Sequence, residues 1–254
     1  MSTPIRRCAL CALLAGGTAA AAAACDPAAF LVAVDPGHTP RRPGAVSARG
    51  IPEYRFNDDL AGVLVGELAK AGFRDVLLTR KPGSEIALLQ RTAAANRRGA
   101  RLFLSIHHDS VQPRYLAPGD VDGRRRSYSD AFSGYSLFFS RENADPDASL
   151  AFARLLGTRL RTSGFTPTLH HAEQIGGENR ELVDAQRGIY RFDALAVLKS
   201  ARMPALLVEA GIIVNRGDEL RLREPAHQRK FARVITQAVA DFCGLGMVQP
   251  WMRR

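Results

Sequence analysis

Short, continuously apolar runs alternate along this chain with longer segments in which apolar residues recur at helical spacing. Such runs are typical of strands buried on both faces, and strands that alternate with helices form parallel sheets. We therefore predict an α/β fold, with a single twisted, mostly parallel sheet flanked by helices on both faces. The expected strands are Phe30–Val34, Val76–Thr79, Leu102–Ile106, Tyr135–Phe139, Ala194–Leu198 and Ala205–Val208, and the expected helices are Glu53–Ala71, Ser84–Arg98, Pro146–Thr162 and Glu224–Phe242.

Two segments lack a clear pattern. Residues 111–133 are rich in Pro, Gly, Asp, Ser and Arg and predict an extended loop. Residues 163–190 are ambiguous, with a short helix expected around Glu178–Ala185. Because no internal repeat or long linker divides the pattern, residues 25–254 are expected to form one domain with its core at about residues 31–243.

The first 24 residues have the composition of an export signal. Arg6 and Arg7 end a short basic start, an apolar stretch runs from Cys8 to Ala15, and alanines lead up to Ala24. This order is typical of a secretory signal peptide. No apolar run after residue 31 approaches the ~18 residues of a membrane span. We expect residues 1–24 to be removed and the mature protein to act in the periplasm or at a membrane surface facing it.

Two cysteines remain after the signal, Cys25 and Cys243. The sequence Ala22–Cys25 resembles a lipobox, where a lipoprotein is cleaved and its cysteine acylated, but it lacks the usual leucine. An oxidising compartment equally permits a disulfide between the two cysteines. The sequence therefore leaves two alternatives, a lipid anchor at Cys25 and a Cys25–Cys243 disulfide.

The chain is strongly basic, with a formal net charge of +10. Removal of residues 1–24 takes away Arg6 and Arg7 and no acidic residue, so the mature charge is +8. A basic exported protein can bind an anionic wall polymer, anionic lipid or nucleic acid. No nucleic-acid fold signature is present, which argues against nucleic acid as a partner. The densest basic cluster, Arg124–Arg126, is expected to be a solvated loop.

Residues that bind metals or transfer protons follow three of the expected strands. His38, His107 and Glu209 each close an apolar run, and Glu53 opens the first expected helix. In a parallel sheet, ligands bind beyond the carboxyl ends of the strands. We therefore expect these four side chains to gather around one point.

The four residue types match a zinc hydrolase. His38, Glu53 and His107 form a set of three protein ligands that leaves the fourth zinc position open, as catalytic sites do. A further carboxylate must take a proton from water and deliver it to the leaving amine, and Glu209 fits this role. Gly211 is expected to leave room for substrate. Each residue alone is compatible with a structural role, so the prediction of one zinc ion depends on their coincident placement.

Short motifs that contain these residues occur in a fixed order. They are D-P-G-H at Asp35–His38, G-x-x-E at Gly50–Glu53, L-T-R at Leu78–Arg80, R-x-x-x-x-N at Arg91–Asn96, S-I-H at Ser105–His107, R-G-I at Arg187–Ile189 and P-A-L-L-V-E-A-G at Pro204–Gly211, with Asn215 shortly after. Over residues 31–243 the chain thus resembles the zinc-dependent N-acetylmuramoyl-L-alanine amidases, the third amidase family of bacterial cell-wall hydrolases. The resemblance implies peptidoglycan as substrate and His38, Glu53 and His107 as zinc ligands. It also implies that Glu209 is the catalytic glutamate.

The chain departs from this family beside the metal. The family has two glycines after the first histidine, where this chain has Thr39–Arg42, so the substrate subtype stays open. Members controlled by cell-division partners often carry a long inserted helix that plugs the zinc site, for which this chain has no room. Within residues 163–190, the side chains of His170, His171 and Glu178 could reach the metal, but a solvated loop of the substrate cleft is expected.

Three functions are compatible with these residues. The leading hypothesis is an amidase that cleaves the bond between the lactyl group of N-acetylmuramic acid and L-alanine. A zinc peptidase acting within the stem peptide could use the same ligands. A non-catalytic peptidoglycan-binding module would not need the proton shuttle that Glu209 supplies. We expect a monomer, and the sequence identifies no activating protein.

Overall fold

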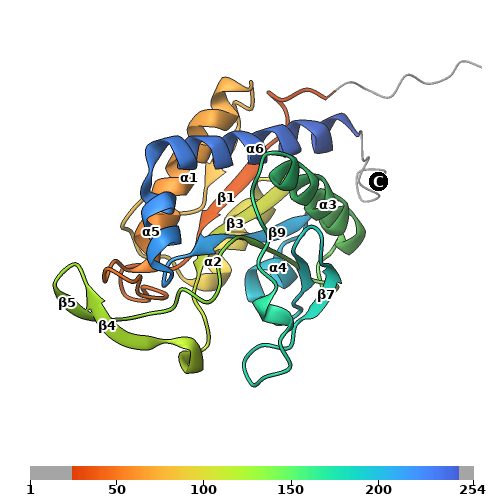
Figure 1. The fold of residues 1–254 in the computed structure, drawn as a ribbon. Helices are drawn as coiled ribbons and strands as arrows, with labels where there is room; N and C mark the ends of the chain where they lie inside the picture. Colours follow the sequence, from red (N-terminus) through yellow and green to blue (C-terminus); the bar gives the residue numbers. More distant parts are fainter. Residues whose placement is uncertain (1–24, 246–254) are drawn as a thin grey trace, which may run out of the picture.

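The computed structural model describes residues 25–245, and its centre is a seven-stranded sheet (Figure 1). The strands are β1 Val32–Pro36, β2 Val76–Leu78, β3 Leu102–Asp109, β6 Ser136–Phe139, β7 Glu181–Asp184, β8 Ile189–Arg191 and β9 Ala205–Ile212, in the order β2-β1-β3-β9-β6-β8-β7. The four neighbouring strands β2, β1, β3 and β9 are parallel to one another, and β6 is parallel to β8. Only the β6–β9 and β7–β8 pairs of this sheet are antiparallel.

Helices cover both faces of the sheet. One face carries α1 Glu53–Lys70, α3 Pro146–Thr162 and α6 Pro225–Gly244, and the other carries α2 Leu88–Arg97 and α4 Ala196–Ser200 (Figure 1). Strand side chains alternate between these layers, as the pleat requires. Val34 and Ile106 pack on the first layer, and Ala33 and Phe103 pack on the second. The predicted α/β fold is confirmed.

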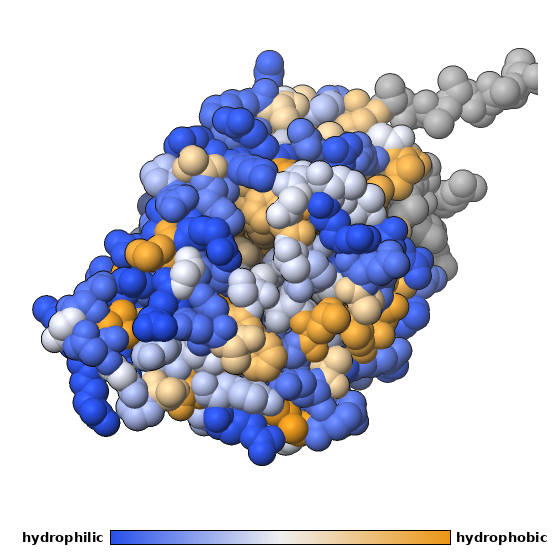
Figure 2. All heavy atoms as spheres, viewed as in Figure 1, coloured by the Kyte–Doolittle hydropathy of each residue, from blue (hydrophilic) through white to orange (hydrophobic). Residues whose placement is uncertain are grey.

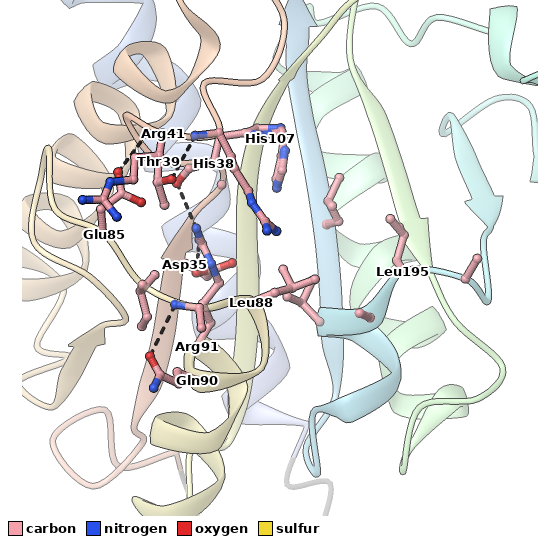
Figure 3. Close-up of a pocket in the computed structure, with 18 residues that line it drawn as sticks. Asp35, His38, Thr39, Arg41, Glu85, Leu88, Gln90, Arg91, His107 and Leu195 are labelled. Atoms are coloured by element: carbon pink, nitrogen blue, oxygen red, sulfur yellow. Dashed lines mark hydrogen bonds and ion pairs between the residues drawn. The ribbon is translucent and has the colours of Figure 1, made fainter.

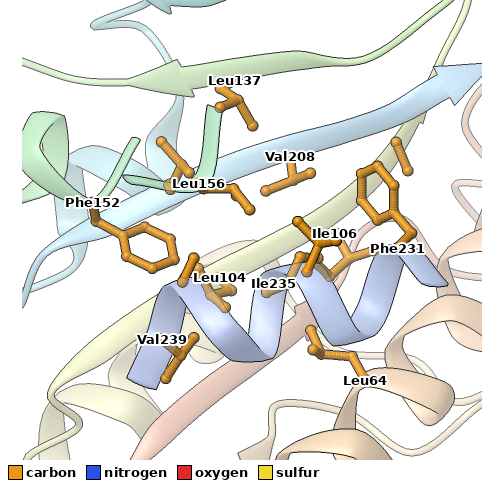
Figure 4. Close-up of a cluster of buried hydrophobic side chains, with 14 of the residues drawn as sticks. Leu64, Leu104, Ile106, Leu137, Phe152, Leu156, Val208, Phe231, Ile235 and Val239 are labelled. Atoms are coloured by element: carbon orange, nitrogen blue, oxygen red, sulfur yellow. The ribbon is translucent and has the colours of Figure 1, made fainter. Parts of the chain in front are cut away.

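The larger core lies between the sheet and α6 (Figure 4). Ile235 of α6 is fully buried beside Leu104 and Ile106 of β3, and Phe152 and Leu156 of α3 close the cluster. Burying one such side chain contributes roughly 1.5–3 kcal/mol. This packing fixes β3 and β9, the two central strands whose carboxyl ends lead to the predicted site.

The second predicted helix begins later than expected. It was predicted from Ser84, but α2 begins at Leu88. The Ser84 hydroxyl donates a hydrogen bond to the carbonyl oxygen of Lys81, and so does its backbone N–H, which closes a turn there. Serine side chains compete with helices in this way. Pro146–Thr162 has the predicted bounds, and its N-cap Asp145 accepts a hydrogen bond from the N–H of Ala148.

The prediction of an extended loop over residues 111–133 is wrong in its centre. Strands β4 Ala117–Val121 and β5 Arg124–Tyr128 form an antiparallel hairpin. Asp122 and Gly123 connect them with φ angles of 53° and 75°. Asp-Gly is the sequence signal for this turn, because both central residues need positive φ. The Arg124–Arg126 cluster therefore lies on a strand, with Arg124 and Arg125 exposed.

Two further predictions on the carboxyl-terminal side are wrong. The short helix expected around Glu178–Ala185 is the strand β7, and the strand expected at Ala194–Leu198 overlaps the helix α4. Periodicity cannot separate a strand from a buried helix in such short apolar segments. The helix α5 Arg216–Arg223 was not predicted, although its N-cap Asn215 accepts hydrogen bonds from two backbone N–H groups.

A disulfide joins the two ends of the described chain. Cys25 and Cys243 are bonded, with their Cα atoms 5.2 Å apart and a separation of 218 positions in the sequence. This outcome selects one of the two alternatives, because a disulfide-bonded Cys25 has no thiol left to carry a lipid. The predicted signal peptide, residues 1–24, lies outside the described residues.

The surface is largely hydrophilic on the side that Figure 2 shows, with apolar side chains in small, scattered groups. None of the helices within residues 25–245 combines the length and the apolar character needed to cross a membrane.

Candidate active site

The parallel strands bring the predicted site residues to one edge of the sheet. His38 lies two residues beyond β1, His107 lies near the end of β3, and Glu209 lies on β9. His107 and Glu209 are direct neighbours in the register of β3 and β9. Glu53 is the first residue of α1. The structure therefore places all four residues at the carboxyl edge, as the fold argument expects.

Three of these side chains share a tight cluster. Glu53 lies between the histidines, with its Oε2 atom 3.1 Å from Nε2 of His38 and its Oε1 atom 3.1 Å from Nδ1 of His107. One ligand atom from each of the three lies within 4.8 Å of the others. Burial raises the pKa of Glu53, but hydrogen bonds from His107 and then His38 outweigh it, so the pKa lies well below its usual range. The carboxylate is therefore ionised and can bind a cation.

Two glycines make room for this cluster. A Cβ atom on Gly37 would lie 2.2 Å from Nε2 of His107, and one on Gly44 would lie 2.3 Å from Oε2 of Glu53. Gly44 also has a φ of 77°, which side chains with a Cβ rarely adopt. The backbone thus approaches the donor atoms as closely as it can. Two imidazoles and one carboxylate in such a cradle fit a zinc ion, whose catalytic sites use this donor set.

Two arginines hold the loop around His38 by hydrogen bonds to its backbone carbonyl oxygens. His38 itself has a φ of 60°, an uncommon conformation for a residue with a side chain. Arg91 donates hydrogen bonds to the carbonyl oxygens of Pro36 and His38, and Arg80 donates to those of Pro36 and Gly37. Both guanidinium groups are buried. They hold the imidazole of His38 in place by fixing the backbone on both sides of Gly37.

The carboxylate of Asp35 holds Arg91 and the neighbouring strands in place beneath the loop of His38. Its carboxylate accepts hydrogen bonds from Thr79, Ser105 and Arg91, at 2.5, 2.9 and 2.8 Å. All four side chains are buried, so each polar group needs the partner that the others supply. The sequence motifs that contain Asp35, Thr79 and Arg91 were recognised, but their role in supporting His38 was not predicted.

The second histidine of the pair at the end of β3, His108, has a different role. The Nδ1 atom of His108 is hydrogen-bonded to Oδ1 of Asn57, at 2.8 Å, and its ring packs on Phe56. Burial lowers the pKa of His108 to about 3, so the ring is neutral. Asn57 also donates hydrogen bonds to Glu53 and to the carbonyl oxygen of Gly37. His108 therefore supports the cluster through Asn57, and His107 is the histidine that joins it.

Glu209 has an unusual environment. Its Oε2 atom is buried and makes no hydrogen bond within residues 25–245. Burial, and then the negative charges of Asp109 and Glu53, raise its pKa well above the usual range for a carboxyl group. A Cβ atom on Gly211 would meet Leu222 of α5 at 2.9 Å, so this glycine lets α5 pack closely on β9. Its expected role in admitting substrate stays a prediction.

A pocket of 810 Å³ opens beside the cluster (Figure 3). Its inner end is formed by His38 and His107, and its walls come from the loop after His38 and from the segments around α2 and α4. The lining combines apolar Leu88 and Leu195 with polar residues that include Arg41. Glu209 is not among the residues that line this pocket, although Leu207 of the same strand is.

Neither expectation for residues 163–190, side chains that reach the metal or a solvated loop, matches the structure around His170 and His171. His170 and His171 do not join the first cluster but meet Asp109, at the end of β3. His170 and Glu178 are buried, so this part of the segment is not a solvated loop. Burial lowers the pKa of His171, but Asp109 and Glu178 outweigh it and raise the pKa to about 9.

Comparison with known proteins places the chain in one family. The N-acetylmuramoyl-L-alanine amidase family (Amidase_3) matches residues 32–241, well over half of the chain. The N-acetylmuramoyl-L-alanine amidase AmiA of Escherichia coli is 28% identical over 221 residues, which cover 84% of this chain and 75% of AmiA. The amidase AmiC of Neisseria meningitidis is 25% identical over 225 residues, 86% of this chain and 54% of AmiC.

Solved structures share the fold. The amidase Ami1 of Mycobacterium smegmatis superposes with a TM-score of 0.68 at 23% identity, covering 87% of this chain and 99% of Ami1. The catalytic domain of the amidase CwlV from Bacillus (Paenibacillus) polymyxa gives 0.64 at 26% identity, covering 84% of this chain and 97% of that domain. The matched region contains the whole histidine–glutamate cluster and Glu209, and the chain belongs to the N-acetylmuramoyl-L-alanine amidase family.

Proposed function

We propose that this protein is an exported zinc amidase that hydrolyses the bond between N-acetylmuramic acid and L-alanine in peptidoglycan. The observation that carries this proposal is the convergence of His38, Glu53 and His107 at the carboxyl edge of the sheet, with Glu209 next to His107. Family membership supports the amide bond and the substrate.

His38, Glu53 and His107 would hold one zinc ion. When bound, zinc supplies Lewis-acid polarisation of the lactyl carbonyl group and of the attacking water. Glu53 contacts both imidazoles, through one carboxylate oxygen each. Asn57 donates a hydrogen bond to Glu53 and would help to keep this carboxylate in place.

Glu209 would move the proton. It takes a proton from water as the water oxygen attacks the carbonyl carbon, and delivers it to the nitrogen of L-alanine as the C–N bond breaks. A buried carboxyl group with a raised pKa is a competent acid near neutral pH for that second step. The products are a lactyl carboxylate on the glycan and a free amino group on the stem peptide.

The pocket beside His38 would receive the stem peptide. Its apolar wall at Leu88 and Leu195 suits the aliphatic parts of a short peptide, and Arg41 and Arg42 provide positive charge for carboxylate groups. The scissile bond would then lie at the end of the pocket that His38 and His107 line, next to the strand pair that carries His107 and Glu209.

Mass analysis of digested peptidoglycan tests the reaction. We expect glycans with lactyl ends and intact free stem peptides, and we expect neither with Glu209→Gln protein as the matched control. Peptides cut within the stem would instead show a peptidase. Binding to the wall without any product would show a non-catalytic module.

Export and mature boundaries are part of the same proposal. Residues 1–24 would be removed as a signal peptide, which leaves residues 25–254 as a monomeric catalytic domain in the periplasm. The Cys25–Cys243 disulfide supports this proposal, since stable disulfides form in oxidising compartments. Mass spectrometry of the mature protein tests it, because the first residue should be Cys25 or lie close to it.

A further inference from the structure

Two histidines outside the first cluster aim at one carboxylate. The Nε2 atoms of His170 and His171 lie 3.4 Å and 2.8 Å from Oδ2 of Asp109. The two rings are 3.9 Å apart between centroids, and His170 is almost completely buried. In a tetrahedral zinc site with ligand distances of about 2.0–2.2 Å, neighbouring donor atoms lie about 3.3–3.6 Å apart. The distance from His170 to Asp109 falls in this range, the one from His171 is shorter, and all three donor atoms lie within 4.8 Å of one another.

The other nitrogen of each ring already has a partner. Nδ1 of His171 is 2.8 Å from Oε2 of Glu178, whose Oε1 atom accepts a hydrogen bond from Gln112. Nδ1 of His170 is 2.9 Å from the hydroxyl oxygen of Thr168. Histidines that bind metals usually have this arrangement, in which the outer nitrogen is fixed and the inner nitrogen faces the ion.

An ion pair explains only half of this cluster. A protonated His171 between Asp109 and Glu178 would be satisfied at both nitrogens. His170 would not, because its buried Nε2 atom makes no hydrogen bond within residues 25–245. Buried polar atoms nearly always have a partner, so this nitrogen requires one. A cation between the two rings and Asp109 would supply it.

We propose that Asp109, His170 and His171 bind a second zinc ion, separate from the ion assigned to His38, Glu53 and His107. Two imidazole nitrogens and one carboxylate oxygen are zinc ligands, whereas calcium and magnesium take oxygen ligands. Phe132 and Phe138 pack against the two imidazole rings and shield the site from water. The ion would tie the segment that contains His170 and His171 to the end of β3.

Counting zinc in purified protein tests the second site. After removal of loosely bound metal by dialysis, elemental mass spectrometry should find two zinc ions per chain in the unchanged protein. His170→Ala should retain one ion, and so should His38→Ala, which disables the other cluster. His227→Ala is the matched control, because His227 lies on α6 outside both clusters and should leave two ions bound. One ion in the unchanged protein, retained in full by His170→Ala, would overturn the proposal.

A measurement without any substitution guards against variants that fail to fold. Crystals of the unchanged protein, measured on both sides of the zinc absorption edge, should show an anomalous peak between the Nε2 atoms of His170 and His171. No peak there, with a peak beside Glu53, would reject the second site and leave the proposed amidase intact. A peak only at Asp109 would reject the zinc site of the proposed function instead.

Discussion

The Oε2 atom of Glu209 and the whole side chain of His108 are buried beside the sheet, and burial shifts the pKa of each group toward its neutral form. The pKa of Glu209 is raised well above its usual range, and that of His108 is lowered to about 3. The consequences differ because the two residues have different partners. His108 is held by a hydrogen bond to Asn57, whereas one oxygen of Glu209 has no partner among the described residues and is free to exchange a proton.

Replacing Glu209 by glutamine should abolish proton transfer while keeping the shape of the side chain. We expect kcat to fall by roughly 10²–10⁴-fold, the usual contribution of general acid–base catalysis. Zinc content and melting temperature should match those of the unchanged protein, since Glu209 does not belong to the histidine–glutamate cluster. Kinetics on peptidoglycan fragments and elemental analysis measure both. Loss of zinc from this variant would make Glu209 a ligand.

His108 should make the folded state sensitive to acid. Its pKa is about 3 in the folded protein and about 6.5 when unfolded, so the unfolded state binds more protons between these values. Stability is therefore lost as pH falls below about 6.5. Chelator-treated protein should lose about 2 kcal/mol of unfolding free energy from this residue between pH 7 and pH 5. Urea titrations of His108→Gln should show that loss reduced, and an unchanged slope would contradict the assignment.

The gathering of the proposed site residues could be predicted from the sequence, but the contacts that support them could not. His38, His107 and Glu209 each close an apolar run of the sequence, and a parallel sheet places the ends of such runs together whatever the intervening sequence. The contacts of Arg91 and Asn57 depend on where α2 and α1 lie against the loop, which no local pattern encodes. Arg91 had a sequence signal only because it belongs to a recognised motif. Asn57 had no such signal.

The loop between β1 and α1 is the element on which the proposed zinc site depends most. It brings Gly37 against His107 and His38 into a strained backbone conformation, and two buried arginines hold its carbonyl groups. Arginine can do this because its planar group donates several hydrogen bonds in fixed directions. The loop is thus prearranged by the protein before any ion binds.

Arg91→Lys should loosen the loop without removing the positive charge. Lysine cannot reach the carbonyl oxygens of Pro36 and His38 together with Asp35, so we expect zinc affinity to fall roughly 10–100-fold, as for other residues that support ligands. Competition with a chromophoric chelator measures this. Arg97→Lys, on an exposed turn of the same helix, is the control and should change nothing. Equal affinities for the two variants would contradict the role of Arg91.

Gly37→Ala should disrupt the cluster directly. The added Cβ would meet Nε2 of His107 at 2.2 Å, so the imidazole or the loop must move, and zinc binding and activity should both be lost. Gly62→Ala adds the same group in α1, where no atom lies within 4 Å. That control should keep full activity and gain up to about 1 kcal/mol of stability, since alanine favours helices. Zinc titration and thermal unfolding distinguish the two variants.

The elements differ in how far their sequences determine them. Long amphipathic segments such as Pro146–Thr162 were predicted to the residue, because periodicity and an N-cap agree. Five-residue elements such as α4 were not, since a short apolar segment fits either a strand or a helix until its neighbours are known. The second histidine cluster could not be found either, because it joins the end of β3 to a segment without regular pattern.

At the scale of the whole molecule, the Cys25–Cys243 disulfide joins the two ends of the described chain into one large loop. A disulfide restricts the unfolded state, and removing one from a protein typically costs about 2–4 kcal/mol. Cys243→Ser should therefore lower the unfolding free energy by about that amount, with full activity below the transition. Guanidinium titrations of oxidised and reduced protein provide the measurement. Identical midpoints, with the thiols shown to be free only after reduction, would contradict this contribution.

The same disulfide fixes where the two ends of the described chain lie relative to the proposed site. Cys25 precedes the amino end of β1, whereas the proposed zinc cluster lies beyond the carboxyl end of that strand. Because Cys25 and Cys243 are bonded, the two ends of the described chain lie together (Figure 1), away from the end of β1 that carries this cluster. Attachment of this domain to a bead, a surface or a fused protein through either end would leave the pocket beside His38 facing outward. An immobile polymer such as the cell wall could then still reach it.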